Sequence, residues 1–228
     1  DEQDMRKMGG LKRIIPFTYS IMLTGSLALA GFPFLTGFYS KDLILESAFG
    51  CFTHLGHYGY YLGLFSAFLT AFYSTRLLYL TFLSKPNGFR VMYEKSTDSS
   101  YFICIVLNIL VIPSIFIGFY SKDLFVGFGT DTWSTSIYVD PKNLSMLDGE
   151  FIPFLFKTTP ICFSLFGLVS CFLFYSQKPK IIYNIKRTKL GFLYYNFLNK
   201  KWYIDKIYSE TLGQFVLSSS YNTSYKMI

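Results

Sequence analysis

The stretch GSLALAGFPFLTGFYSKDLILE, residues 25–46, decides what kind of fold this chain adopts. It belongs to a long apolar region, which Gly31 and Pro33 interrupt near the middle. One straight helix through the whole region would exceed the roughly 30 Å hydrocarbon core of a bilayer. Proline lacks a backbone N–H and disfavours helix at the residue before it. The sequence therefore predicts one membrane span at about residues 14–30 and a second at about residues 33–52.

The second of these predicted spans contains Lys41, Asp42 and Glu46. Charged side chains are costly in hydrocarbon, so a plain lipid-facing helix would carry none of them. Irregular backbone at membrane depth is tolerated where it is buried in protein or lines a wet cavity, and such segments mark ion sites in transporters. We therefore predict that residues 33–52 form a broken helix whose charged residues face protein or water.

The composition of the whole chain agrees with a membrane protein. Of its 228 residues, 51% are hydrophobic and only 15% are charged, which is too apolar a balance for an ordinary soluble domain. Three further apolar regions, at about residues 58–83, 101–120 and 154–176, are each long enough to cross a bilayer. The predicted fold is all-α and polytopic, with about five spans including one broken helix.

The formal net charge of +7 originates in the C-terminal tail. Residues 177–228 contain nine Lys or Arg against two acidic residues, and the rest of the chain sums to zero. Basic residues alternate there with Tyr, Phe, Ile and Leu, which favours amphipathic helices on a membrane surface or against a neighbouring subunit. A solvated basic tail is the alternative. We therefore divide the chain into a transmembrane region, residues 1–176, and an amphipathic tail, residues 177–228.

Loop charges predict how the spans are oriented. Residues 121–153 contain two Lys against five Asp or Glu, whereas residues 84–100 and the tail are net positive. Lys and Arg accumulate on the cytoplasmic or matrix side of a membrane. We therefore expect residues 84–100 and the tail on that side and residues 121–153 on the other. Five spans would place the N-terminal stretch on the side opposite to the tail.

The heptapeptide GFYSKDL occurs twice, at residues 37–43 and 118–124. The first copy lies inside an apolar region, whereas the second closes a span and opens a polar loop. Lys122 in the second copy can therefore extend to water more easily than Lys41. We expect the second copy to be structural.

Ionisable residues in or near the spans are the candidate functional residues. Lys41 and Asp42 are the primary candidates, for a proton relay, because a buried amine releases its proton more easily while an adjacent carboxylate opposes that release. Glu46 and Arg76 are secondary candidates. The alternative for Lys41 is a purely structural ion pair, and interfacial extension or a buried ion pair is the favoured interpretation of Arg76. Lys157, near the start of its span, is expected to be interfacial.

The sequence predicts no cofactor, metal or nucleic-acid site in this chain. It has no nucleotide-binding, haem or iron–sulfur signature, and no CxxC pair. We expect the four cysteines, Cys51, Cys104, Cys162 and Cys171, to behave as small apolar residues. The two histidines, His54 and His57, are expected to be solvated or interfacial. Redox chemistry is therefore not expected within this chain.

Several stretches of the sequence resemble one family. DEQDMRKMGGL at residues 1–11 and GSLALAGFPFLTGFYSKD at residues 25–42 look like the signature of the antiporter-like subunit 5 of mitochondrial NADH dehydrogenase, complex I. YSTRL at residues 73–77, residues 127–133 and KWYIDKIY at residues 201–208 also resemble that subunit, as spelled in protist and plant mitochondria. The resemblance covers nearly the whole chain and corresponds to the C-terminal portion of the subunit.

The resemblance implies a function. The family is a multi-pass membrane-arm subunit of the proton-translocating NADH:ubiquinone oxidoreductase of the respiratory chain, in the mitochondrial inner membrane. Lys41 falls on the family's lysine in the distal proton half-channel, and Asp42 on its acidic neighbour. The tail would face the matrix and lead toward a lateral helix. FMN, iron–sulfur clusters and ubiquinone act elsewhere in the assembly. Tyr39 replaces a Trp usual in chloroplast and bacterial relatives, which favours the mitochondrial assignment.

The resemblance also has gaps. The family's first half-channel would precede Asp1, so we expect a separate polypeptide to carry the N-terminal part of the subunit. The other expected partners are complex I membrane-arm subunits and membrane lipids. Two alternative functions stay open: a non-pumping structural or assembly piece of the same arm, and a subunit of a multisubunit sodium/proton antiporter. The spelling of residues 1–42 argues against the antiporter.

Overall fold

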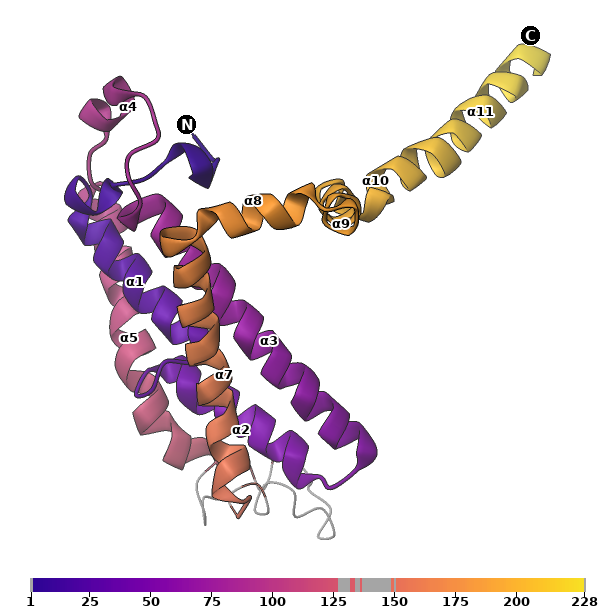
Figure 1. The fold of residues 1–228 in the computed structure, drawn as a ribbon. Helices are drawn as coiled ribbons and strands as arrows, with labels where there is room; N and C mark the ends of the chain where they lie inside the picture. Colours follow the sequence, from indigo (N-terminus) through magenta and orange to yellow (C-terminus); the bar gives the residue numbers. More distant parts are fainter. Residues whose placement is uncertain (1, 127–131, 134–135, 137–148, 150, 228) are drawn as a thin grey trace. The chain divides into compact units, whose positions relative to one another are not determined.

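The apolar regions of the sequence form helices, as predicted. The computed structural model describes residues 2–126, 132–133, 136, 149 and 151–227, and within them every regular element is helical. The chain divides into two compact units, Asp1–Gln177 and Lys178–Ile228. The helices of the first unit (Figure 1) are α1 Pro16–Ala30, α2 Thr36–Gly50, α3 His54–Leu78 with a π-helical extension Tyr79–Leu83, α4 Arg90–Lys95, α5 Tyr101–Val126, and α7 Phe154–Phe172 with a π-helical extension Leu173–Gln177.

The predicted break between the first two helices is confirmed. Gly31 follows the last residue of α1 and adopts the left-handed conformation with φ 79°, which only glycine adopts freely. Its N–H donates to the carbonyl of Ala28, and the N–H of Phe32 donates to the carbonyl of Leu27. These two bonds form a Schellman motif, which satisfies carbonyls at the end of α1. The chain turns there before α2 begins.

The prediction that residues 33–52 are themselves broken is wrong. α2 is one continuous helix over Thr36–Gly50, and the interruption lies before it. Pro33 precedes the helix, so its missing N–H and its effect on the preceding residue act in the connection rather than inside α2. The broken element is the pair α1 and α2.

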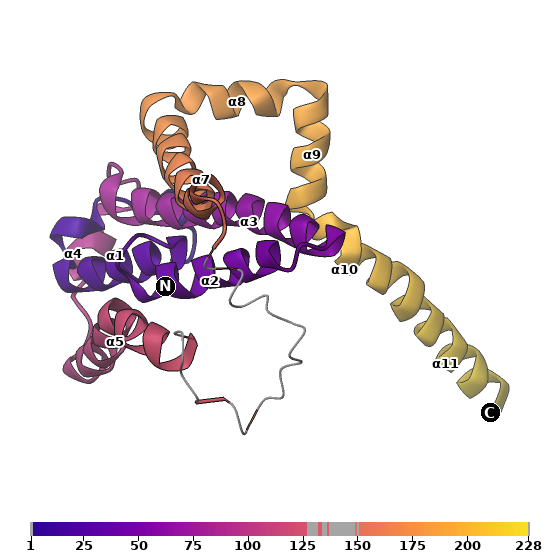
Figure 2. The same cartoon turned by 90° about the horizontal axis from the view of Figure 1, so that it is seen from below.

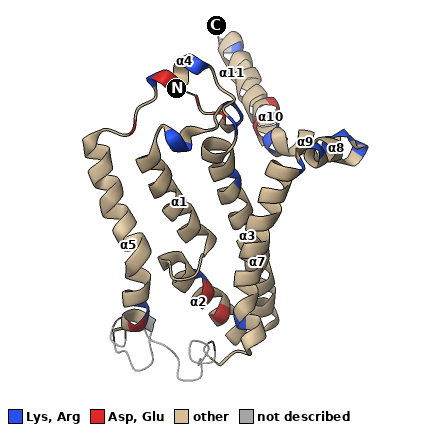
Figure 3. Ribbon diagram, turned by 60° about the vertical axis from the view of Figure 1, so that its left-hand side comes forward, with Lys and Arg blue, Asp and Glu red and all other residues tan. Residues whose placement is uncertain are grey.

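α1 and α2 together make one crossing of the first unit, so the predicted count of five spans becomes four. Tyr19 of α1 packs on Phe82 at the end of α3, with ring centroids 5.3 Å apart, whereas Phe49 of α2 packs on Tyr60 near the start of α3, at 5.1 Å. The two short helices therefore cover opposite ends of the same partner, one after the other (Figure 3). Each has 15 residues, about 22 Å, which is too short for a ~30 Å hydrocarbon core.

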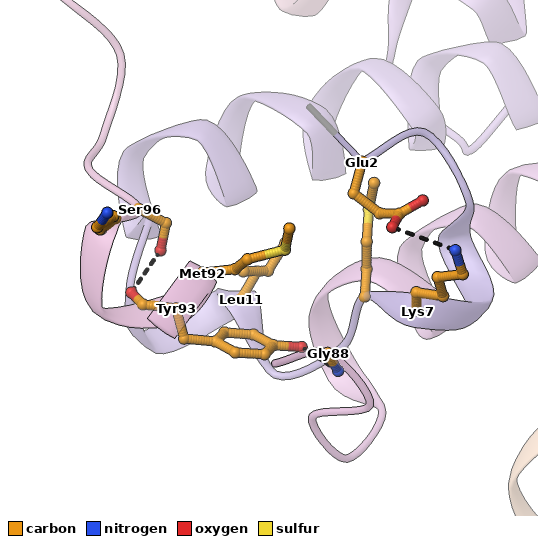
Figure 4. A pocket seen from close by; sticks show the side chains of 9 residues that line it. Glu2, Lys7, Leu11, Gly88, Met92, Tyr93 and Ser96 are labelled. Carbon is orange, nitrogen blue, oxygen red and sulfur yellow. Dashed lines mark hydrogen bonds and ion pairs between the residues drawn. The ribbon is translucent and has the colours of Figure 1, made fainter. Parts of the chain in front are cut away.

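The N-terminal stretch consequently lies at the same end of the unit as residues 84–100, contrary to the prediction. Asn87 Nδ2 donates to the carbonyl of Arg6, and the backbone N–H of Phe17 donates to Asp98. A shared hollow (Figure 4) is lined by residues of both segments: Glu2, Lys7 and Leu11 of the N-terminal stretch, and Gly88, Met92, Tyr93 and Ser96. An even number of crossings explains this arrangement. Most of the predicted acidic loop, residues 121–153, lies outside the described residues.

α3 is the central helix, and α7 packs closely along it. Small residues allow this approach: Ala67 and Ala71 of α3 are fully buried, and Gly167 of α7 faces them. A Cβ added at Gly167 would lie 2.5 Å from the carbonyl oxygen of Phe68. Small residues at such contacts are typical of helix pairs in membranes. A second cluster, formed by Leu45, Phe49, Tyr60, Leu64 and Ile152, joins α2 and α3 to the segment before α7.

Two of the described helices are long and apolar enough to cross a membrane by themselves, Tyr101–Phe125 and Phe154–Gln177. Large apolar side chains on the outer face of α5 are mostly exposed; Ile109 is 62% exposed. Because exposed apolar surface of this extent is costly in water, α5 is suited to contact lipid.

The second unit consists of α8 Pro179–Arg187, α9 Lys189–Asn199, α10 Ile204–Ile207 and α11 Gln214–Met227. α8 and α9 meet at Thr188, whose hydroxyl accepts a hydrogen bond from the N–H of Gly191. This bond caps the start of α9.

Candidate functional site

Lys41 lies in the second turn of α2, close to the break. Its Nζ donates to the hydroxyl of Thr70 on α3 over 3.1 Å. Thr70 in turn donates to the carbonyl of Ala67, so its hydroxyl is free to accept from the lysine. A Cβ added at Gly31 would lie 3.3 Å from Lys41 Cδ, and the absent side chain therefore leaves room for the lysine stem. The predicted primary residue is thus half-buried and held by a polar partner.

The end of α1 stabilises a positive charge at Lys41. The carbonyl ends of helices carry partial negative charge, and Lys41 approaches α1 where that helix ends. A broken helix therefore provides electrostatic stabilisation that a continuous one would not. The break and the lysine therefore belong to one structural arrangement.

Asp42 and Glu46 follow on the same face of α2, because residues four apart are neighbours on a helix. Lys157 of α7 forms an ion pair with Glu46, Nζ to Oε1 3.7 Å. Asp42 lies within electrostatic range of Lys41, Glu46 and Lys157. The secondary candidate Glu46 therefore joins the primary pair. Two carboxylates of α2 thus lie between a lysine of the same helix and a lysine of α7.

A cavity of about 260 Å³ lies beside this row of charges. Asp42 and Glu46 line it from α2, Lys157 from α7, and Lys122 from α5. Polar groups converging on a hollow inside an apolar helix bundle are suited to hold water or ions. We name Lys41, Asp42, Glu46, Lys157 and Lys122 the charged row.

The sequence-based prediction did not include two members of the charged row. Lys157, expected at the interface, is paired with Glu46 and is 40% exposed in its side chain. Lys122, expected to be structural, lines the same cavity as Asp42 and is therefore no neutral comparison for Lys41. No sequence signal pointed to Thr70, which is one of many hydroxyl residues in apolar segments.

Tyr60 is a further polar residue near the charged row that sequence reasoning did not find. Its hydroxyl donates to the carbonyl of Phe156 over 2.7 Å and also bonds the hydroxyl of Thr159. Tyr60 as a whole is 2% exposed. Tyr60 thereby fixes the start of α7, and with it the position of Lys157.

Arg76 lies on the α7-facing side of α3. Its guanidinium carbon is 5.6 Å from the centre of the Tyr175 ring, within the range of a cation–π contact. Its Nε is buried and has no hydrogen-bond partner within the described residues. The contacts of Arg76 therefore differ from those of the charged row, and it is not assembled with Lys41.

Within the part of the chain that the structure describes, no group of three or more His, Cys, Asp or Glu could hold a metal ion. The charged row itself offers amines and carboxylates, which are groups that can exchange protons, and Thr70 adds a hydroxyl, which can donate and accept hydrogen bonds.

Comparisons with known proteins agree on one family. The family model described as NADH:quinone oxidoreductase/Mrp antiporter, TM, matches residues 1–70. NADH-ubiquinone oxidoreductase chain 5 of Phytophthora infestans is 54% identical over 228 residues, which are 100% of this chain and 34% of that protein. The proteins of the same name from Marchantia polymorpha and Acanthamoeba castellanii are 42% and 46% identical over 229 residues, again 100% of this chain and 34% of theirs.

The chain thus spans about a third of the length of the curated relatives it matches. The transmembrane family and the apolar helices together establish a membrane protein. The chain belongs to the family of NADH-ubiquinone oxidoreductase chain 5.

Proposed function

We propose that this chain is part of a membrane-arm subunit of the proton-pumping NADH:ubiquinone oxidoreductase, in the mitochondrial inner membrane. It contributes a proton half-channel and carries out no redox chemistry itself. FMN, iron–sulfur clusters and ubiquinone act in other subunits of the assembly. The observation that carries the proposal is the charged row, which begins at a broken helix inside an apolar helix bundle. Ionisable groups at such a place are functional by default.

In the proposed mechanism Lys41 holds a proton and passes it along the row. Thr70 and the end of α1 stabilise the ammonium form. Asp42 is the adjacent acceptor, and Glu46 follows one turn later on α2. The charges of the row interact with one another, so a proton gained or lost at one carboxylate changes the electrostatic energy of the other charges.

The proposed exit lies at the end of the unit where α2 ends and α7 begins. Glu46 and Lys157 meet there, Lys157 within the first turn of α7, and the cavity adjoins them. The N-terminal stretch and residues 84–100 lie at the opposite end. With the positive end in the matrix, protons would leave toward the intermembrane space.

The proposed partners are other complex I membrane-arm subunits and membrane lipids. The part of such a subunit that this chain does not match would complete the path. We propose no nucleic-acid partner, because the excess positive charge is confined to the tail.

A second candidate function is a structural, non-pumping piece of the same arm. One observation favours it: Lys41 is bonded to Thr70 and Glu46 is paired with Lys157, as in a static network. The two candidates differ in whether Lys41 must change its charge during turnover.

The test is the variant Lys41→Met in the assembled enzyme, with Lys85→Met as the control. Lys85 is exposed and lies in the 84–100 segment, so its replacement also removes one positive charge but leaves the charged row intact. A relay predicts that Lys41→Met slows NADH oxidation coupled to quinone reduction while oxidation by an artificial electron acceptor stays normal. Normal coupled turnover in an assembled Lys41→Met enzyme would favour the structural candidate.

A further inference from the structure

The second unit contains a long cationic segment without an acidic residue. Residues 178–204 include seven Lys or Arg and no Asp or Glu. Lys and Arg recur along α8 (Figure 3). A surface of this kind repels other basic surfaces and attracts anionic ones. The cationic segment is therefore suited to bind a partner with a high density of negative charge.

α8 and α9 meet at a corner (Figure 2), and two of these cations lie beside it. Lys186 and Arg187 of α8 line a hollow of about 250 Å³ together with Tyr183 and Phe192. The Nζ of Lys186 lies 3.8 Å from the centre of the Tyr195 ring on α9, a cation–π contact that holds the corner together. The corner combines two positive charges with aromatic walls.

Apolar faces adjoin this corner. Ile181, Ile182 and Ile185 lie along one face of α8 by helical spacing, and Ile185 is 56% exposed. On α9, Leu190, Leu193 and Leu198 are 69%, 64% and 59% exposed. Exposed apolar side chains beside cations are typical of helices that lie in a membrane interface.

We propose that α8 and α9 bind a surface of anionic phospholipid, with a lipid phosphate at the Lys186–Arg187 corner. The helical extension of α7 ends at Gln177, one residue before the cationic segment begins. If α7 spans the bilayer, the segment starts at the membrane surface, where anionic headgroups are concentrated. The apolar faces enter the acyl boundary while the cations reach the phosphates. This inference does not depend on whether Lys41 relays protons.

The test uses the full chain and one of its own tryptophans. The chain has two Trp, so Trp133→Phe leaves Trp202, which packs on Phe197 of α9 with ring centroids 5.3 Å apart. The protein is reconstituted into vesicles of brominated phosphatidylcholine, with or without one part in three of phosphatidylglycerol. Quenching of Trp202 by the bromine reports whether the corner lies in the lipid.

Strong quenching is expected only with phosphatidylglycerol, and 1 M salt should abolish it, because the screening length falls to about 3 Å. Lys186→Gln with Arg187→Gln should lower the ratio of docked to free tail about 25-fold, at about fivefold for each cation. Lys206→Gln with Lys226→Gln removes the same charge outside the corner and should change the ratio far less; Lys206 is paired with Glu210.

Three results would overturn the proposal. Quenching that is equal in both lipid mixtures would show apolar docking without a phosphate site. If the ratio of docked to free tail fell equally in the two double variants, net charge rather than a site at the corner would explain the binding. Protection of Trp202 from both the brominated lipid and aqueous iodide would show that protein, rather than lipid, covers α9.

Discussion

The ion pair between Glu46 and Lys157 offers the sharpest structural test of the charged row. At 3.7 Å and an effective dielectric constant of about 20, two unit charges attract by about 4.5 kcal/mol. Lys157 is 40% exposed in its side chain, and solvent screening reduces the expected coupling to about 1–2 kcal/mol. The perturbation is a double-mutant cycle of Glu46→Gln, Lys157→Met and the two together.

The two single variants should lower the free energy of unfolding by different amounts. Glu46 is only 12% exposed, so Lys157→Met removes a cation from a nearly buried carboxylate and should cost about 2–3 kcal/mol. Glu46→Gln leaves Lys157 able to reach water and should cost about 1 kcal/mol. The double variant should be less destabilised than the sum, by the coupling of about 1–2 kcal/mol.

Unfolding of the full chain by a denaturing detergent in mixed micelles, followed by far-UV circular dichroism, measures these free energies. The matched control is the pair Arg90 and Glu94, 2.8 Å apart, with side chains 91% and 61% exposed. A double-mutant cycle on this control pair should give a coupling energy of at most about 0.5 kcal/mol. A Glu46–Lys157 coupling no larger than this control, or equal costs for the two single variants, would refute a half-buried pair joining α2 to α7.

Three further predictions address other parts of the molecule. Thr70→Val, which removes the acceptor of Lys41, should slow coupled turnover severalfold, whereas Thr70→Ser should restore it; equal rates in both variants would contradict the contact. Gly167→Val places a side chain against the α3 backbone and should destabilise the chain by about 1–3 kcal/mol in the same unfolding measurement, while the unpacked Gly25→Val should cost less. Hydrogen bonds from the Thr18 hydroxyl and from backbone N–H groups hold the pKa of Asp98 below its usual range. Its contribution to stability is therefore fully present above the unfolded carboxyl's pKa, about 3.9, and declines as the pH falls through the lower folded value; Asp98→Asn should flatten the acid limb of stability against pH.

The break at Gly31 was predictable because its cause is local. A glycine that can adopt positive φ, followed two residues later by proline, ends a helix whatever surrounds it. Whether the two resulting helices make one crossing or two is not a local property. It depends on which ends of α3 they contact, and Tyr19 and Phe49 find those contacts through tertiary packing.

The charged row likewise contains residues that local sequence could predict and residues that only tertiary packing brings together. Asp42 and Glu46 were predictable as neighbours, since their spacing places them on one helix face whatever the helix packs against. Lys157 and Lys122 join them from α7 and α5, and sequence position cannot show that those helices meet α2. The proposed role of Lys41 was inferred from the family resemblance. Its hydrogen-bond partner, Thr70, could be identified only from the structure.

The most direct measurement of the proposed role of Lys41 is the number of protons translocated per NADH oxidised. The assembled enzyme carrying Lys41→Met is reconstituted into sealed vesicles, and proton uptake is followed with a pH-sensitive dye during a limited NADH pulse. Wild-type enzyme and Lys85→Met provide the reference ratio. A relay at Lys41 predicts a ratio below that reference, or a slower coupled rate, with oxidation by an artificial acceptor unchanged. A fully assembled Lys41→Met enzyme that pumps at the reference ratio and rate would contradict the relay.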